Sequence, residues 1–219
     1  MNKRVMELNN VEVWDGNMAN SQALRQADVD VVAAYPITPS TATVENYAMF
    51  HANGYIDGEV MMTESEHAAM SACIGAGAAG GRVATATSSQ GLALMIETLY
   101  QASGMRIPVV LCLVNRALAA PLNVNGDHSD LYLTRDSGWI SIDAFSPQEA
   151  YDMTLMSFKI SEHPEVRLPV ISNQDGFMTS HTAQNVLPLK DDVACKFVGD
   201  YLQVNALLNF DKPVTHGVQ

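Results

Sequence analysis

Short apolar runs alternate with longer stretches of helical periodicity up to about residue 175, and this alternation constrains the fold more than any other feature. The apolar runs predict strands, and the stretches between them predict helices. Such alternation produces a mainly parallel sheet with helices on both faces, so the predicted fold class is α/β. The predicted strands are 29–37, 59–62, 82–87, 107–114, 139–145 and 168–173. The predicted helices are 17–27, 41–52, 65–79 and 89–102, with a further helix beginning at Pro147.

The regular pattern fades after Gly176. Residues 181–219 carry scattered apolar positions without a clear period. We therefore predict one domain over residues 1–180 and a C-terminal extension or linker over 181–219, which leads to a further domain outside this chain.

Composition and charge exclude several classes of protein. With 47% hydrophobic and 16% charged residues, the 219-residue chain is expected to be globular with a substantial core. Its formal net charge of −12, without a Lys/Arg cluster, argues against nucleic acid or an anionic membrane as a partner. No apolar run approaches the roughly 18 residues of a membrane span, and no signal segment is visible, so a cytoplasmic location is expected.

The three cysteines, Cys73, Cys112 and Cys195, are isolated in the sequence and form no CxxC motif. They cannot by themselves hold an iron–sulfur cluster of the four-cysteine kind. We expect them to be buried, reduced structural thiols.

Residues 75–80 match the pattern GxGxxG, which in dinucleotide-binding folds places a pyrophosphate at the N-terminus of a helix. Here the glycines lie at the end of a predicted helix, and a strand follows them. We therefore interpret them as helix-packing glycines with a C-terminal cap rather than as a nucleotide site.

Ligands of open parallel α/β sheets bind beyond the carboxyl ends of the strands, so the residues at those positions are the candidate site. They are 38–41, 63–66, 88–91, 115–116 and 175–177. Each group also has an ordinary explanation. Thr38 could be a turn or cap hydroxyl, Glu66 could favour the helix dipole, the serines near 88 could cap a helix, and Arg116 could be a solvated loop residue.

The stretch 123–130 brings Asp127, His128 and Asp130 close together in the sequence. These residue types can bind a metal, but a complete ligand set is missing, so no metal site is predicted.

Several motifs together resemble one family. Residues 35–41 (YPITPST) resemble a signature of the 2-oxoacid:ferredoxin oxidoreductases, and the other motifs follow in that family's order and spacing. The similarity runs from about Val13 to the C-terminus. Two stretches, 115–121 and 126–130, are more similar to the alpha subunit of the pyruvate enzymes than to the 2-oxoglutarate or branched-chain relatives. The other motifs are ESEHAA at 64–69, ATSSQG at 86–91, NRA at 115–117, GDHSD at 126–130 and DGFMTSH at 175–181.

The resemblance implies a pyrimidine-type thiamine-diphosphate-binding fold and assigns roles to the candidate residues. Glu66, rather than Glu64, would hydrogen-bond the pyrimidine ring and manage its proton. Thr38 and Arg116 would hold the carboxylate or keto oxygen of the 2-oxoacid, and both count with Glu66 as catalytic candidates. Further residues implied to contact the cofactor are Pro36, Ile37, Ser89 and Gln90.

The resemblance also implies partners. Enzymes of this class bind the diphosphate and Mg²⁺ through a GDG motif, which this sequence lacks. The diphosphate site, the Mg²⁺ and the [4Fe-4S] clusters would therefore lie on partner chains, a beta-type subunit and further iron–sulfur subunits. Pyruvate would be decarboxylated, coenzyme A would be the co-substrate, and ferredoxin or flavodoxin would accept the electrons.

The sequence leaves other functions open. The chain could act on another 2-oxoacid, such as 2-oxoglutarate or a branched-chain acid. It could also be a non-catalytic scaffold subunit, or a stand-alone nucleotide-binding module. The joint presence of Glu66, Thr38 and Arg116 favours an enzyme subunit over a scaffold.

Overall fold

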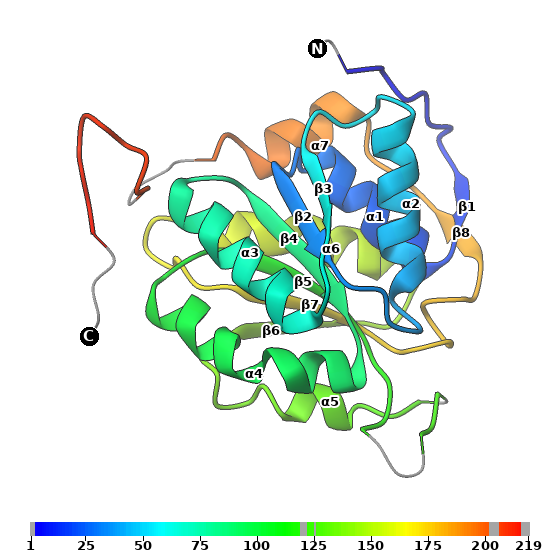
Figure 1. Cartoon of the computed structure of the whole chain (residues 1–219). Helices are drawn as coiled ribbons and strands as arrows, with labels where there is room; N and C mark the ends of the chain where they lie inside the picture. The colour runs from blue at the N-terminus through cyan, green and yellow to red at the C-terminus, as the bar shows by residue number, and fades with distance from the viewer. Residues whose placement is uncertain (1–2, 119–121, 125, 202–205, 216–219) are drawn as a thin grey trace.

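A computed structural model describes residues 3–118, 122–124, 126–201 and 206–215. Its centre is a six-stranded sheet in which all neighbouring strands are parallel (Figure 1). The predicted α/β class is confirmed, and each predicted strand is present with ends shifted by at most three residues. In spatial order the strands are β3 (Glu59–Met62), β2 (Val31–Ala34), β4 (Val83–Thr87), β5 (Val109–Val114), β7 (Val170–Gln174) and β6 (Ile140–Ala144).

Helices cover both faces of this sheet (Figure 1). One face packs against α1 (Gly16–Gln26), α2 (Thr41–Ala52) and α6 (Pro147–Ser161). The other face packs against α3 (Glu66–Ala79) and α4 (Ser89–Gly104).

The central strand β5 shows why the sheet must be covered twice. Val110 and Cys112 belong to the core on the α1 side, whereas Leu111 and Leu113 belong to the core on the α3 side. Successive side chains of a strand point to opposite faces, and every residue of β5 is buried. Fully burying a side chain such as Leu111 contributes roughly 1.5–3 kcal/mol.

Side-chain caps set the starts of three helices. Asp15 Oδ1 accepts a hydrogen bond from the Met18 amide of α1. Ser65 caps α3 and Ser146 caps α6 in the same way. Pro147 occupies the first turn of α6, where its missing amide proton leaves no helical bond unmade.

Two glycines of the GxGxxG stretch have the expected roles, because Gly77 packs closely on its surroundings and Gly80 ends the helix. A Cβ on Gly77 would lie 2.5 Å from Cγ2 of Ile107. The close packing of α3 on the segment that leads into β5 therefore requires glycine at this position. Gly80 ends α3 in a left-handed conformation with φ of 113°. Both roles are structural.

Residues 184–198 pack on the same core as the rest of the chain. β8 (Gln184–Val186) pairs with β1 (Glu12–Trp14) in an antiparallel ribbon that the sequence did not predict. The following helix α7 (Asp191–Val198) buries Ala194 and Val198 against the α1 side of the sheet. The extension therefore begins as a packed segment, and the further domain to which it leads stays a prediction.

The cysteines divide into two environments. Cys73 and Cys112 are buried, and burial raises the pKa of each thiol to about 12, which keeps both protonated and unreactive. Cys195 is exposed, so the expectation that all three are buried was wrong for this residue. It lies on α7, a helix that the sequence pattern did not reveal.

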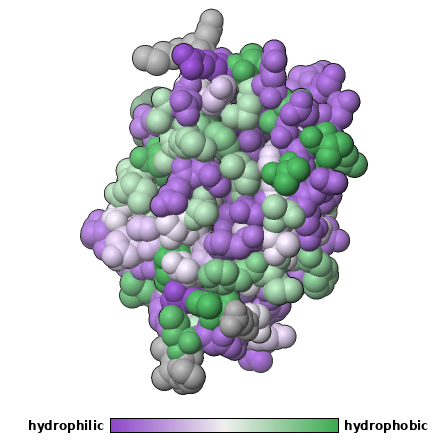
Figure 2. Space-filling model, turned by 90° about the vertical axis from the view of Figure 1, so that its right-hand side faces the viewer, coloured by the Kyte–Doolittle hydropathy of each residue, from purple (hydrophilic) through white to green (hydrophobic). Residues whose placement is uncertain are grey.

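Within the described residues, no helix is long and apolar enough to cross a membrane. The side of the molecule that carries β1, β8 and α2 shows hydrophilic and hydrophobic side chains interspersed in small groups (Figure 2).

The strand order places the topological switch point of the sheet between β2 and β4. The chain runs from β2 out to β3 and then crosses back over β2 to β4. The connections that follow β2 and β4 therefore leave in opposite directions, and α/β folds have their ligand crevice beyond the carboxyl ends of such strands. The segments that follow β2, β3 and β4 are those in which the candidate residues lie.

Candidate active site

The turn after β2 carries Thr38 and is held from below by α1. Asn17 donates from Nδ2 to the Pro39 carbonyl (3.1 Å) and accepts from Thr43 Oγ1 (2.8 Å). Thr38 itself is exposed, and Ser40 rather than Thr38 occupies the N-cap position of α2. The Thr38 hydroxyl therefore caps no helix and faces out of the fold.

Glu66 is the first residue of α3 and follows closely on the carboxyl end of β3. Glu66 is 7% exposed, whereas Glu64 is exposed, so the two glutamates have different environments. Burial of Glu66 depends on Gly91 in α4. A Cβ on Gly91 would lie 2.7 Å from Glu66 Oε1 and 2.3 Å from Thr87 Oγ1. No described residue donates a hydrogen bond to the Glu66 carboxylate, which leaves a buried acceptor facing the crevice.

Arg116 joins the turn after β2 to the start of α4. Its Nη1 donates to the Thr38 carbonyl (2.7 Å) and its Nη2 donates to Gln90 Oε1 (2.6 Å). Both partners are neutral oxygens, and each terminal nitrogen keeps a second N–H. Within the described chain, no carboxylate lies at ion-pair distance from Arg116.

Burial is the main influence on the pKa of Arg116. Burial lowers the pKa of the guanidinium, while the negative charges of Asp130 and Glu66 act in the opposite direction. An arginine remains protonated under either influence. A buried positive charge without a directly bonded carboxylate attracts a small anion into the crevice.

Ser89 and Gln90 form the other wall. Ser89 Oγ lies 2.5 Å from both Gln90 Oε1 and the Ala117 carbonyl, so its hydroxyl can donate to one of them. Ser89 has a left-handed backbone with φ of 46°, which non-glycine residues seldom adopt and which the surrounding contacts must hold. Ser88 makes no side-chain cap to α4, so its expected capping role is absent.

Asp130 lies beneath this wall and is fully buried. Its Oδ2 accepts from the amides of Ser89 (2.9 Å) and Arg116 (3.0 Å). Burial raises the pKa of Asp130, although these hydrogen bonds act to lower it. From the sequence, Asp130 was considered only as a possible metal ligand. Its hydrogen bonds to the Ser89 and Arg116 amides were not predicted. The GDHSD motif was the available signal, but nothing in it indicated a contact with residues 41 positions earlier.

The other residues of that motif point elsewhere. Asp127 accepts hydrogen bonds from the amide and hydroxyl of Ser129, which hold its pKa below the usual range. His128 Nε2 lies 2.7 Å from Asp175 Oδ2. The three side chains therefore diverge, and the described residues contain no group of three or more metal-binding side chains.

Several buried polar atoms beyond the carboxyl ends of β4, β5 and β7 make no hydrogen bond within the protein. They include atoms of a hydroxyl, an amide, a guanidinium and a carboxylate, which most buried polar groups would not leave unsatisfied. The concentration of such atoms at one end of the sheet indicates a place for a ligand. They are Thr87 Oγ1, Ser88 Oγ, Asn115 Oδ1, Arg116 Nε, both terminal atoms of Gln174, and Asp175 Oδ1.

The fold therefore brings together five of the predicted site residues: Thr38, Glu66, Ser89, Gln90 and Arg116. The other two make no described contact with them. Pro36 is exposed and Ile37 is partly buried on the approach to the turn.

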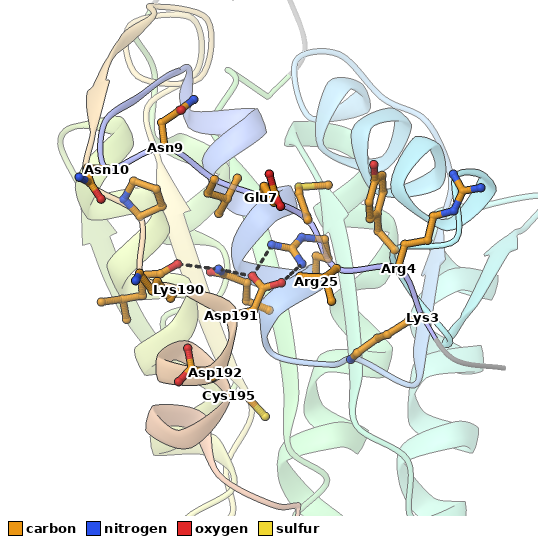
Figure 3. A pocket seen from close by; sticks show the side chains of 17 residues that line it. Lys3, Arg4, Glu7, Asn9, Asn10, Arg25, Lys190, Asp191, Asp192 and Cys195 are labelled. Carbon is orange, nitrogen blue, oxygen red and sulfur yellow. Dashed lines mark hydrogen bonds and ion pairs between the residues drawn. The ribbon is translucent and has the colours of Figure 1, made fainter.

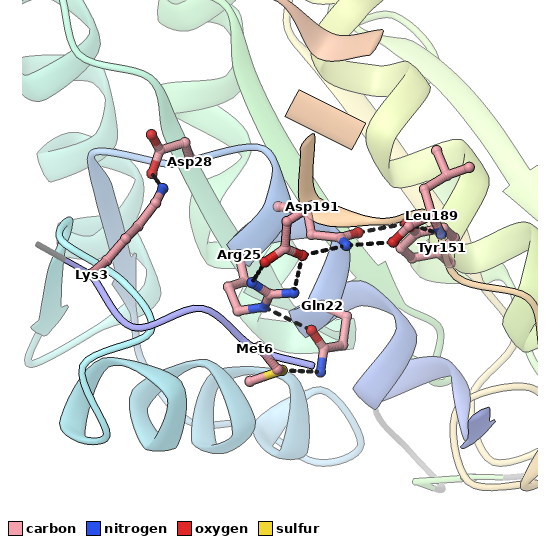
Figure 4. Close-up of polar contacts among 9 residues, drawn as sticks. Lys3, Met6, Gln22, Arg25, Asp28, Tyr151, Leu189 and Asp191 are labelled. Carbon is pink, nitrogen blue, oxygen red and sulfur yellow. Dashed lines mark hydrogen bonds and ion pairs between the residues drawn. The ribbon is translucent and has the colours of Figure 1, made fainter. Parts of the chain in front are cut away.

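A cavity at the opposite end of the sheet is a poor candidate for this chemistry. It has a volume of about 710 Å³ and lies between the N-terminal segment and the chain leading into α7 (Figure 3). The polar side chains that line this cavity already form hydrogen bonds with one another. Arg25 donates to both oxygens of Asp191 (2.7 and 2.8 Å), and Gln26 donates to the same carboxylate and to Leu189 (Figure 4).

Comparison with known proteins assigns a family to this arrangement. The family model described as pyruvate flavodoxin/ferredoxin oxidoreductase, thiamine-diphosphate-binding, matches residues 22–219. The chain belongs to this family. The predicted resemblance and the thiamine-diphosphate-binding type of fold are therefore confirmed.

Curated relatives agree with this assignment. The chain is 50% identical over 207 residues to pyruvate synthase subunit PorA of Methanocaldococcus jannaschii, covering 94% of this chain and 53% of the relative. It is 50% identical to the corresponding subunit of Thermotoga maritima, covering 92% and 52%. It is 44% identical to ketoisovalerate oxidoreductase subunit VorA of Pyrococcus abyssi, covering 94% and 52%. The chain thus spans about half the length of these relatives.

A solved structure supports the same conclusion. The 2-oxoglutarate:ferredoxin oxidoreductase of Magnetococcus marinus, with 2-oxoglutarate, coenzyme A and succinyl-CoA bound, has a TM-score of 0.75 and 28% identity to this chain. The match covers 86% of this chain and 33% of that one. Family members thus include proteins named for different 2-oxoacids.

The residues present fit one side of a thiamine cofactor. A buried carboxylate without a donor suits a protonated ring nitrogen, because a charge-assisted hydrogen bond is strong in a dry crevice. Glu66 provides that carboxylate, and Gly91 leaves the space beside it.

Proposed function

We propose that this chain supplies the pyrimidine-side half of the active site in a thiamine-diphosphate-dependent oxidoreductase. The complex would convert pyruvate and coenzyme A to acetyl-CoA and CO₂, and would pass the electrons to ferredoxin or flavodoxin. The observation that carries the proposal is the crevice in which Glu66 has no donor and Arg116 has no carboxylate partner.

In this proposal each residue has a defined task. Glu66 accepts a hydrogen bond from the pyrimidine ring and holds its proton in place. Arg116 and the exposed Thr38 hydroxyl bind the carboxylate or keto oxygen of the 2-oxoacid. Ser89 and Gln90 line the wall against which cofactor and substrate rest, with Pro36 and Ile37 at the entrance. The cofactor, when bound, supplies the carbanion chemistry of decarboxylation.

Partner chains complete the proposal. A beta-type subunit would bind the diphosphate and Mg²⁺, further subunits would carry the [4Fe-4S] clusters, and the assembly would be cytoplasmic. The covering surface between the subunits would exclude water from the crevice, which strengthens the hydrogen bond to Glu66.

Pyruvate is favoured over other 2-oxoacids by two relatives named pyruvate synthase with 50% identity. Other pyruvate synthase subunits have 42–45% identity, which overlaps with the 44% of the ketoisovalerate subunit. The difference is modest, so a branched-chain acid or 2-oxoglutarate is the second candidate substrate.

The test is to purify the native complex anaerobically and measure reduction of a viologen dye. Pyruvate, 2-oxoglutarate and 2-oxoisovalerate would be compared, each with coenzyme A. We expect the highest kcat/KM for pyruvate. Equal or higher values for another acid would reassign the substrate, and no 2-oxoacid-dependent reduction at all would overturn the proposed function.

Binding separates the enzyme subunit from its alternatives. In calorimetric titration, the isolated chain should bind thiamine diphosphate weakly or not at all, and the complex should bind it tightly. A nucleotide-binding module would instead bind its ligand alone, and a scaffold would show no dependence of turnover on Glu66.

A further inference from the structure

Asp130 is a buried carboxylate at the base of the site, and its place in the fold is unlike that of the other acidic residues. Its side chain is 0% exposed, and no lysine or arginine side chain in the described residues bonds to it. Burying a charge without a directly paired cation is costly, so its hydrogen bonds must compensate.

Four donors surround this carboxylate. Oδ2 accepts from the Ser89 and Arg116 amides, at 2.9 and 3.0 Å. Oδ1 accepts from Asn115 Nδ2 and the Leu131 amide, both at 2.8 Å. The Ser89 amide lies at the N-terminus of α4, where a negative charge is also favoured by the helix dipole. Only a carboxylate offers two acceptor oxygens in this geometry, because an amide would turn an N–H group toward one pair of donors.

These bonds fix two segments that come from different strands. Ser89 follows β4 and Arg116 follows β5, and the same oxygen holds both backbones. The side chains that project from these segments then meet, because Arg116 Nη2 donates to Gln90 Oε1. The left-handed backbone of Ser89 requires such a restraint, since a residue in that conformation relaxes when its surroundings allow it.

Resting on the proposed function, we propose that Asp130 is a positioning residue for substrate binding. Its carboxylate holds the backbones of Ser89 and Arg116, and through them it sets the Arg116 guanidinium that receives the 2-oxoacid and the Gln90 carboxamide that accepts a hydrogen bond from it. Asp130 does not touch the substrate, and its loss affects binding through Arg116 rather than through Glu66.

The test compares Asp130→Asn with Glu162→Gln in the native complex. Glu162 serves as the control because its carboxylate side chain is only 9% exposed and accepts two hydrogen bonds from Arg82, but at the opposite end of the sheet. We expect Asp130→Asn to raise the KM for the 2-oxoacid about ten-fold or more, with kcat lowered much less. Glu162→Gln should lower the unfolding temperature and leave KM unchanged.

A double-variant cycle identifies the route of the effect. If Asp130 acts through Arg116, then Asp130→Asn should add little to the rise in KM already caused by Arg116→Ala. Fully multiplicative effects of the two changes would overturn the proposal, because they would show that Asp130 acts independently of Arg116.

Amide hydrogen exchange gives a readout that does not depend on turnover. Asp130→Asn should speed exchange of the Ser89 and Arg116 amides, while amides of β2 stay as in the parent complex. Unchanged exchange at both amides, or an unchanged KM, would overturn the proposal. If Asp130→Asn does not assemble, Asn115→Ala removes one of the four donors and decides the question by the same measurements, with a smaller rise in KM expected.

Failure of the proposed function is recognised separately. A parent complex that turns over no 2-oxoacid overturns that function and the substrate-positioning role with it. If the parent complex is active, the results for the variants test only the positioning role of Asp130.

Discussion

The two ends of the parallel sheet differ in whether their arginine and glutamate side chains pair with an opposite charge. At the amino end, Arg82 donates to both oxygens of Glu162 (2.7 and 2.8 Å), and Arg25 does the same to Asp191. At the carboxyl end, Arg116 donates only to neutral oxygens, and no described residue donates to the Glu66 carboxylate.

The difference separates stability from function. A buried charge whose partner is a neighbouring side chain holds segments of the chain together, as Arg82 does by also bonding the carbonyls of Ala27 and Gly199. A buried charge without such a partner costs folding free energy and is retained where a ligand completes it. Changes at the carboxyl end should therefore alter turnover more than stability, and changes at the amino end should do the reverse.

The largest effect is expected at Glu66. Glu66→Gln removes the carboxylate that manages the ring proton, so turnover should fall by roughly 10²–10⁴-fold while the complex still assembles. The measurement is pyruvate-dependent reduction of a viologen dye. Glu64→Gln is the matched control, because Glu64 is exposed two residues earlier and should change the rate only slightly. Near-normal turnover of the Glu66 variant, or a reversed ranking, would contradict the site assignment.

A second large effect is expected where Gly91 makes room for Glu66. In Gly91→Ala the new Cβ would lie 2.7 Å from Glu66 Oε1, so the carboxylate must move. Misplacement of a catalytic group by about 1 Å can cost about 10² in rate, and a loss of that order in kcat is expected. Gly75→Ala is the control, because a Cβ there meets nothing within 4 Å. Equal activity of both variants would show that Glu66 does not need its observed position.

An intermediate effect is expected at Arg116. Hydrogen bonds to charged groups contribute about 1.5–3 kcal/mol, so Arg116→Ala should raise the KM for pyruvate roughly 10- to 100-fold. The affinity for thiamine diphosphate should change little. Arg25→Ala, at the amino end, should lower the unfolding temperature without changing KM. If the Arg116 variant lost cofactor binding and kept its KM, the substrate role would be wrong.

The smallest effect concerns pH and stability at the amino end. Burial alone would raise the pKa of Asp191, but hydrogen bonds from Arg25 and Gln26 outweigh it and hold that pKa below the usual range. A depressed folded-state pKa stabilises the protein above the unfolded value of about 3.9, and this stabilisation is lost as the pH falls through the folded value.

The expected result is a pH-dependent difference between Asp191→Asn and the parent. The variant should unfold at a slightly lower temperature near neutral pH, and the gap should close below about pH 4. The side chain of Asp191 is 34% exposed, so solvent screening keeps the gap small. Asp192→Asn, an exposed neighbour, should show no gap. A gap that persists at low pH would show that the carboxylate charge does not stabilise α7.

Local signals in the sequence were enough for the main elements of the fold. Alternating apolar runs predicted all six strands of the sheet, because strands buried on both faces are continuously apolar. Pro147 marked the start of α6, because proline is favoured in the first turn of a helix. The ribbon of β1 and β8 was not predicted, since each strand has only three residues and its partner lies far along the chain.

The sequence by itself determined the fold class, the family and the residue types that gather beyond the carboxyl ends of the strands. Tertiary structure alone decided which of those residues meet. Arg116 reaches Thr38 across 78 positions and Gln90 across 26, and Asp130 reaches Ser89 across 41. Such contacts follow from strand order and from the crevice it opens, not from local propensity. The close approach of Gly91 to the Glu66 carboxylate is likewise a contact between distant segments, so only the tertiary structure shows it.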